Sequence, residues 1–84
     1  MLGPPTEFIF VFNDRRRADA AEVEARGVGY VTSVSSGDGE GRHFQLRLRL
    51  GQALSATEFH EREQSLRLLM AKHRGRYEGG SGGD

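Results

Sequence analysis

The sequence contains no cysteine and no tryptophan, and its 12 basic and 12 acidic residues cancel to a formal net charge of zero. Without cysteine the chain forms no disulfide and no thiolate site, and zinc loses its commonest structural ligand. Net neutrality disfavours charge-driven binding to nucleic acid or membranes over a broad surface, while a local charged patch stays compatible with it. The sequence therefore predicts a fold that packing alone stabilises.

Long apolar runs are also missing. No run approaches the roughly 20 apolar residues that span a bilayer, and the opening segment MLGPPTEFIFVF lacks the basic region and longer apolar segment of a secretory signal. We therefore expect a cytoplasmic protein with no membrane partner. The 84 residues, 36% hydrophobic and 29% charged, have the length and composition of one ordinary globular domain.

The first half of the chain predicts a strand, a helix and a second strand. Residues 8–12 (FIFVF) are wholly apolar and β-prone, which is typical of a central strand, and Asn13 favours a turn after them. Residues 15–26 are good helix formers, and Gly27 is placed as a C-cap. Residues 28–35 predict the second strand. Small residues at helical spacing should let the helix lie close on the sheet: Ala18, Ala21 and Ala25.

The second half predicts a hairpin and a second helix. Residues 36–41 form a glycine-rich turn, and residues 44–50 alternate between apolar and polar side chains. Because the connection is short, this third strand should pair antiparallel with the second. Ser55 and Glu58 have capping-box spacing at a helix start, and Gly75 is expected to end that helix with a positive φ. One face of the helix should pack on the sheet: Phe59, Leu66, Leu69, Met70 and His73.

The element order β-α-β-β-α predicts an α+β fold. It matches the split βαβ plan of ferredoxin-like domains, with an antiparallel sheet and two helices on one face. A fourth strand is not obvious, so the sheet has either three strands and an open edge or a short irregular strand at residues 76–79. We expect one domain over residues 1–79, followed by a flexible Gly/Ser tail at 80–84.

No catalytic, cofactor or metal site is predicted. The glycines of residues 37–41 could cradle a phosphate, but this segment carries two acidic residues, joins two strands and lacks a P-loop lysine. His60 and Glu61 match the start of a zinc-binding HExxH motif, whose second histidine is replaced by Gln64. The mixed charges of the second helix indicate a solvated face. The sequence therefore predicts a protein that is not an enzyme.

A strip of arginines on the third strand is the feature most open to a functional interpretation. Arg47 and Arg49 alternate with the leucines and should point away from the core, with Arg42 at the start of the strand. The strip could bind RNA, an acidic surface of a protein partner, a small ligand or a second copy of the chain, or it could simply keep the strand solvated. RNA is disfavoured because Phe44 falls on the core face, which leaves no aromatic platform for bases.

The whole pattern resembles the family of the regulator of ribonuclease E activity B. That family shows an apolar first strand, an alanine-containing helix before a Gly-Tyr, an alternating third strand, a Leu-x-x-Leu-Ala-like helix end and a closing Gly-Gly-x-Tyr-Asp-Gly-Trp signature. The resemblance extends from about residue 7 to residue 79. The matching segments are residues 8–12, 18–27, 29–30, 44–50, 66–71 and 73–79.

The closing segment HRGRYEG, residues 73–79, carries the most specific part of this resemblance. Arg74 stands where the family has its first glycine, Glu78 where it has aspartate, and Gly80 where it has tryptophan. The signature positions that remain are Gly75, Tyr77, Glu78 and Gly79. The Tyr77 ring could cover the end of the core, or Tyr77 and Glu78 could contact a partner, and we favour the structural role first.

The resemblance implies a ferredoxin-like fold and a non-enzymatic function. The family's function implies a protein that binds an RNA-degrading endonuclease of the ribonuclease E type and restrains it through protein contacts. It implies no cofactor, and it leaves the oligomeric state open. The candidate partner-binding residues are Arg42, Arg47, Arg49, Tyr77 and Glu78.

Overall fold

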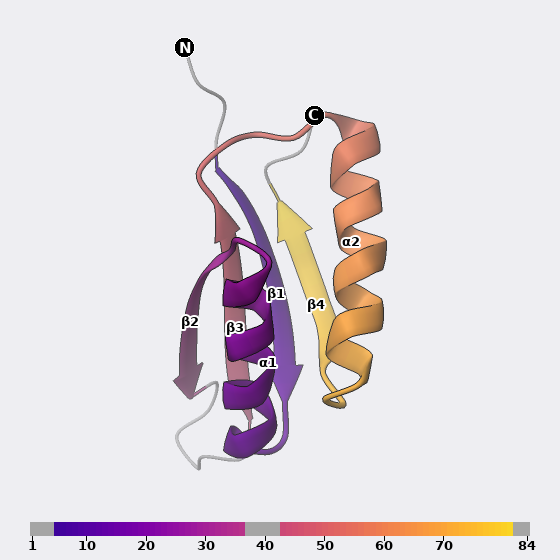
Figure 1. Cartoon of the computed structure of the whole chain (residues 1–84). Coiled ribbons are helices and arrows are strands. Elements are labelled where there is room, and N and C mark those ends of the chain that lie inside the picture. The colour runs from indigo at the N-terminus through magenta and orange to yellow at the C-terminus, as the bar shows by residue number, and fades with distance from the viewer. Residues whose placement is uncertain (1–4, 37–42, 82–84) are drawn as a thin grey trace.

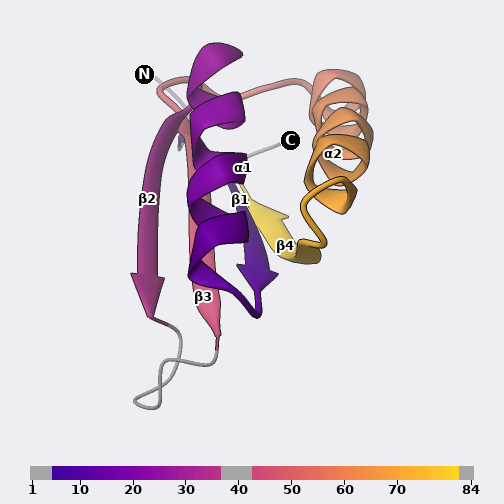
Figure 2. The ribbon, with the colours of Figure 1, turned by 60° about the horizontal axis from the view of Figure 1, so that its bottom comes forward.

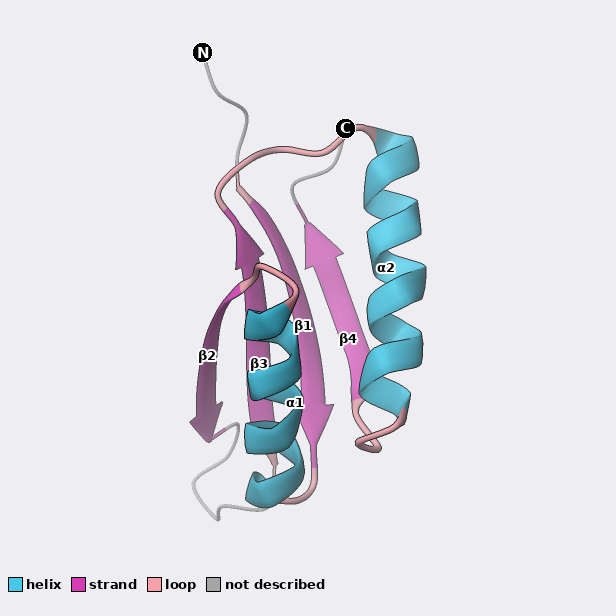
Figure 3. Ribbon diagram, viewed as in Figure 1, coloured by secondary structure: helices cyan, strands magenta, loops and turns pink. Residues whose placement is uncertain are grey.

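The computed structural model describes residues 5–36 and 43–81, which form a layer of strands and a layer of helices (Figure 1). The elements are β1 (Thr6–Phe12), α1 (Arg15–Gly27), β2 (Val31–Ser36), β3 (Phe44–Leu50), α2 (Ala56–Ala71) and β4 (Arg76–Ser81). Both helices lie on the same face of the sheet (Figure 3). This is the ferredoxin-like α+β architecture that the sequence predicts.

The four described strands form one antiparallel sheet in the order β2-β3-β1-β4. The strands β1 and β3 are central, which confirms the prediction for the apolar run FIFVF. Because β3 pairs antiparallel with both β1 and β2, these two strands run parallel to each other on either side of it. By the same logic β3 and β4 run parallel on either side of β1. The sheet therefore consists of two split βαβ units, and β2 and β4 are its edges.

The fourth strand is longer than the sequence indicates. It extends from Arg76 to Ser81 and pairs with β1. Ile9 pairs with Gly79 and Phe10 with Tyr77, so Glu78 is the extra residue of a β-bulge. The expected tail was placed two residues too early, since Gly80 and Ser81 belong to the strand. The rest of that tail, residues 82–84, lies outside the described residues.

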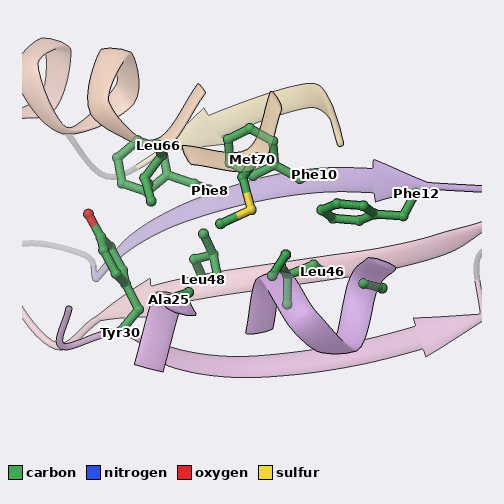
Figure 4. Close-up of a cluster of buried hydrophobic side chains, with 11 residues drawn as sticks. Phe8, Phe10, Phe12, Ala25, Tyr30, Leu46, Leu48, Leu66 and Met70 are labelled. Atoms are coloured by element: carbon green, nitrogen blue, oxygen red, sulfur yellow. The ribbon is translucent and has the colours of Figure 1, made fainter. Parts of the chain in front are cut away.

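The core lies between the sheet and the helices (Figure 4). The helix α1 contributes the three predicted alanines to the core, and all three are fully buried. All seven aromatic rings of the chain, five phenylalanines and two tyrosines, lie in this core or pack against it. The largest fully buried apolar side chains are Phe8, Phe10, Phe12, Leu46, Leu48 and Met70.

The start of α2 confirms the capping box. The Ser55 hydroxyl accepts a hydrogen bond from the Glu58 N–H at 3.2 Å, and the Glu58 carboxylate accepts one from the Ser55 N–H at 3.2 Å. At the start of α1, Asp14 accepts a hydrogen bond from the Arg16 N–H at 2.7 Å. Both helix starts are therefore set by local side-chain chemistry that can be read from the sequence.

The helix ends differ from the prediction in their detail. The positive φ lies two residues after Gly27, at Gly29 (101°), and one residue before Gly75, at Arg74 (61°). At the end of α2, Gly75 N–H donates to Met70 O and Arg74 N–H to Ala71 O, at 2.9 and 3.0 Å. This pair of bonds is a Schellman motif, whose left-handed residue is here an arginine.

Gly75 is required for another reason, the close approach of the chain to the core. A Cβ atom at this position would lie 2.5 Å from Cζ of the buried Phe12 ring and 3.3 Å from Met70 Cβ. The expectation of a positive φ at Gly75 was wrong, because the positive φ lies at Arg74. The lack of a side chain at Gly75 lets β4 begin directly against the core.

Candidate partner-binding surface

The face of the sheet opposite the helices is uncovered among the described residues (Figure 2). We call this face the open face. Strand alternation and register place on it Glu7, Ile9 and Val11 from β1, Val31, Ser33 and Ser35 from β2, and Gln45, Arg47 and Arg49 from β3. It contains Arg47 and Arg49 of the arginine strip identified in the sequence.

Within the described part of the chain, Arg47 and Arg49 share one acidic neighbour. Their guanidinium nitrogens Nη1 and Nε lie 4.0 and 3.6 Å from the same oxygen of Glu7. The Nε of Arg47 also donates a hydrogen bond to the Gln45 side chain at 3.2 Å. The two arginine side chains remain 48% and 57% exposed, and neither β2 nor β3 contains an acidic residue. Two cations beside one carboxylate leave this part of the open face positively charged.

The open face also carries an apolar component. Ile9 and Val11 are half-buried between the neighbouring strands, and Val31 is 68% exposed opposite Arg49. Since all seven aromatic rings belong to the helix side, no ring on this face could stack on a base. A surface of arginines and aliphatic side chains is better suited to a protein than to single-stranded RNA.

Tyr77 lies on the helix side of the sheet and not on the open face. Its hydroxyl donates a hydrogen bond to the Glu63 carboxylate of α2 at 2.6 Å, and its ring packs against Phe10 with centroids 5.0 Å apart. The Arg67 guanidinium lies 5.4 Å from the ring centroid. Burial and the Glu63 carboxylate raise the pKa of the Tyr77 phenol above its usual value, despite the opposing effect of Arg67. Tyr77 thus connects β4 to α2.

Glu78 lies on the open face, because consecutive strand residues point to opposite faces of the sheet. It is exposed and lines a shallow polar pocket of about 170 Å³ at one end of the open face. The other lining residues are Val11, His43, Gln45 and Arg76.

The structure thus separates the predicted partner-binding residues into groups. Arg47, Arg49 and Glu78 share the open face, whereas Tyr77 belongs to the scaffold on the helix side. Arg42 lies outside the described residues. The sequence interpretation missed Glu7, although its period-two spacing from Ile9 and Val11 places it on the same strand face.

A second concave surface lies between α2 and the segment that follows α1. It is a groove of about 460 Å³ with a floor of Tyr30, Leu66 and Leu69 and a rim that includes Val28, which is 57% exposed. The rim also carries the charged residues Glu61 and Arg62, so the groove has no single sign of charge. The groove is a candidate apolar contact site, but it contains none of the predicted partner-binding residues.

The helices are linked by a polar cluster at the C-terminal end of α2. The Glu24 carboxylate of α1 lies 3.2 Å from His73 Nε2 and 3.7 Å from Lys72 Nζ. The paired oxygen of Glu24 and the His73 nitrogen are both shielded from solvent. His73 and Lys72 lower the pKa of Glu24 below its usual value, although partial burial acts in the opposite direction.

Within residues 5–36 and 43–81, no cluster of three or more histidine and carboxylate side chains has the arrangement of a metal site. His60 and Glu61, the incomplete zinc motif, are both exposed on α2. No helix in the described ranges has the length and apolar character needed to cross a bilayer.

Comparison with known proteins gives one finding. A protein-family model described as regulator of ribonuclease activity B matches residues 4–79, a range that includes five complete elements and β4 as far as Gly79. No curated protein matches the chain. The family match confirms the resemblance seen in the alternating third strand and the closing HRGRYEG segment.

Proposed function

Since this chain belongs to the family of regulators of ribonuclease activity B, we propose that it is a non-enzymatic protein that binds an RNA-degrading endonuclease of the ribonuclease E type and restrains it. The family assignment supports regulation, and the identity of the endonuclease and the direction of the effect are part of the proposal. We place this interaction in the cytoplasm, because a chain without cysteine gains nothing from an oxidising compartment.

We choose the contact surface from the exposure and pairing of two arginines. Arg47 and Arg49 stand exposed on the open face and share Glu7 as their one acidic neighbour among the described residues, beside half-buried aliphatic side chains. Partly paired arginines at the edge of an apolar strip can exchange a weak intramolecular ion pair for carboxylates of a partner. We therefore propose the open face, including Glu78 at its end, as the surface that contacts the endonuclease.

The test combines binding with an RNA-cleavage assay. Immobilised chain should retain a purified ribonuclease E-type endonuclease and slow its cleavage of a fluorescent RNA. Arg47→Glu with Arg49→Glu should weaken binding about tenfold or more, since each 1.4 kcal/mol is a factor of ten. The matched control is Arg16→Glu with Arg17→Glu, which makes the same charge change at exposed positions of α1. Unchanged RNA cleavage at saturating concentrations of the chain would refute the proposed function.

A second candidate function, RNA binding, is favoured by the same two arginines. Phosphate contacts by lysine or arginine give affinities that fall steeply with salt. The absence of an aromatic ring from the open face argues against this candidate, as does the Glu7 carboxylate between the guanidinium groups. Titration of a single-stranded RNA at low salt tests it, and binding that is lost in the Arg47→Glu, Arg49→Glu variant would favour it.

A further inference from the structure

The outer edge of β2 is a regular strand edge at the margin of the sheet. On one side β2 pairs with β3 through six consecutive residue pairs without a bulge, and in the described part of the chain no strand pairs with its other side. Proteins usually protect such edges with charged side chains, prolines or bulges. The β2 sequence VTSVSS has none of these. Its main chain therefore offers a template for another strand.

The helices leave this edge accessible. Figure 2 shows β2 at the margin of the sheet, beside α1 and not beneath it. On the helix side, Thr32 is held by hydrogen bonds with Glu22 and Arg26 of α1, at 3.0 and 3.2 Å. These bonds fix the strand against α1 while its outer edge stays unpaired by any described strand.

The open face next to this edge is cationic. Ser33 pairs with Arg47 and Val31 with Arg49, so the arginines lie one strand inward from the edge. Ser33 and Ser35 are small and exposed, which leaves space for the long arginine side chains to lean across β2. Since β2 and β3 contain no acidic residue, a strand that docks beside β2 would meet positive charge on this face.

We propose that β2 is a docking edge that takes an extended acidic segment of the partner endonuclease as an additional strand of the sheet. Main-chain hydrogen bonds to β2 hold the segment, and its alternate carboxylates lie on the open face toward Arg47 and Arg49. The identity of the partner rests on the proposed function, whereas the preference for an acidic strand rests on the edge itself.

A second copy of the chain fits this edge less well. Pairing of β2 with β2 of another copy would place the two sets of arginines on the same face, three strand spacings or about 14 Å apart. Such a dimer would bring no carboxylate to either arginine, because β2 is uncharged. Charge complementarity therefore favours an acidic partner segment.

The docking edge can be tested with defined peptides. The probe is a fluorescein-labelled eight-residue peptide that alternates threonine and glutamate, and its matched control alternates threonine and lysine. In polarisation titrations at low salt, the full chain should bind the glutamate peptide at least tenfold more tightly. Ser33→Glu should weaken this binding at least tenfold, whereas Ser33→Lys at the same exposed position should retain it. Equal binding of both peptides would overturn the proposal.

Two further measurements separate strand addition from simple charge attraction. N-methylation of alternate residues on the hydrogen-bonding edge of the glutamate peptide keeps its charge but prevents main-chain pairing, so it should abolish binding. Hydrogen exchange should slow at the amides of residues 31–36 when the unmodified peptide binds. Full binding of the methylated peptide, or unchanged exchange in β2, would overturn strand addition. A dimer detected by sedimentation, with its β2 amides protected in the absence of peptide, would also overturn the proposal.

The same variants distinguish failure of this inference from failure of the proposed function. If the endonuclease is bound and restrained equally by the chain with Ser33→Glu, and β2 exchange is unchanged in the complex, the docking edge is wrong and the regulatory function stands. If the glutamate peptide docks on β2 but no endonuclease is bound, the regulatory function is wrong and the acidic-strand edge stands.

Discussion

Arg74 adopts the backbone conformation that glycine favours. It has a φ of 61° and is the left-handed residue of the Schellman motif that ends α2. A side chain in this conformation costs roughly 1–2 kcal/mol. The family signature has glycine at this position, so the chain retains the motif with a residue that strains it.

Removal of the strain at Arg74 should stabilise the folded protein. Arg74→Gly should raise the free energy of unfolding by about 1 kcal/mol, equivalent to a melting temperature roughly 4–8 °C higher for a domain of this size. Urea denaturation followed by circular dichroism measures it. Gly29→Ala, at a φ of 101°, is the opposite control and should destabilise. Equal stability of Arg74→Gly and the natural chain would contradict the assigned strain.

Gly75 gives a second prediction at the residue scale. Gly75→Ala should lower the free energy of unfolding by about 1–3 kcal/mol, because its Cβ would overlap the ring of Phe12, which is only 1% exposed. Gly51→Ala is the matched control, since a Cβ there meets no atom within 4 Å. The two variants are compared by urea denaturation, and similar effects in both would show that the Phe12 ring moves aside without cost.

At the scale of elements, the contact between β4 and α2 depends on the Tyr77 hydroxyl. Tyr77→Phe removes its hydrogen bond to Glu63 and should destabilise the protein by about 1 kcal/mol at neutral pH. The pKa of Tyr77 is raised by folding, so its contribution is complete below the usual phenol value near 10 and is lost as the pH rises beyond it. Denaturation at neutral and strongly alkaline pH tests this, and the difference between natural chain and variant should shrink only at alkaline pH.

The contact of Glu24 with His73 and Lys72 should make the stability of the protein depend on pH in the acidic range. The pKa of Glu24 is lowered by His73 and Lys72, so its contribution is present above the usual value near 4.5 and is lost as the pH falls through the lowered value. Glu24→Gln should therefore destabilise the protein at neutral pH, and the difference should vanish in acid. Thermal melts between about pH 3 and pH 7 measure it. An equal difference between Glu24→Gln and the natural chain at both ends of this pH range would contradict the assigned link.

At the scale of the whole molecule, a net charge of zero confines electrostatic attraction to local patches. If Arg47 and Arg49 contact carboxylates of the endonuclease, raising the salt from about 50 to 500 mM should weaken that binding, because the Debye length shortens well below 10 Å. The Arg47→Ala, Arg49→Ala variant should bind more weakly and respond less to salt. Fluorescence titration measures both, and equal salt dependence would place the charged contact elsewhere.

Most of the fold is predictable because its signals are local. The apolar run of β1, the alternation of β3 and the alanine face of α1 each record burial on one side of an element. The capping box of α2 is formed by residues three positions apart. Each pattern depends on the period of its own element, so it needs no knowledge of the partner against which that element packs.

The candidate surface was predictable only in part. Alternation alone puts Arg47 and Arg49 on the side away from the core, and the structure agrees. Strand alternation sends Tyr77 toward α2 and Glu78 to the open face, and the bulge in β4 then returns Gly80, three residues after Tyr77, to the helix side. A bulge depends on pairing with β1, so the sequence around Tyr77 carries little sign of it.

The sequence by itself determined the element order, the core faces and the family of this protein, because these depend on residue types at short spacing. Only the tertiary structure decided the extent of β4, whose glycines pair through main-chain atoms and leave no side-chain pattern. It also decided that Glu7 lies between two arginines about forty residues away, since strand register sets that distance. The edge position of β2 is likewise set by which strands pair, a choice made by long-range contacts across the whole sheet.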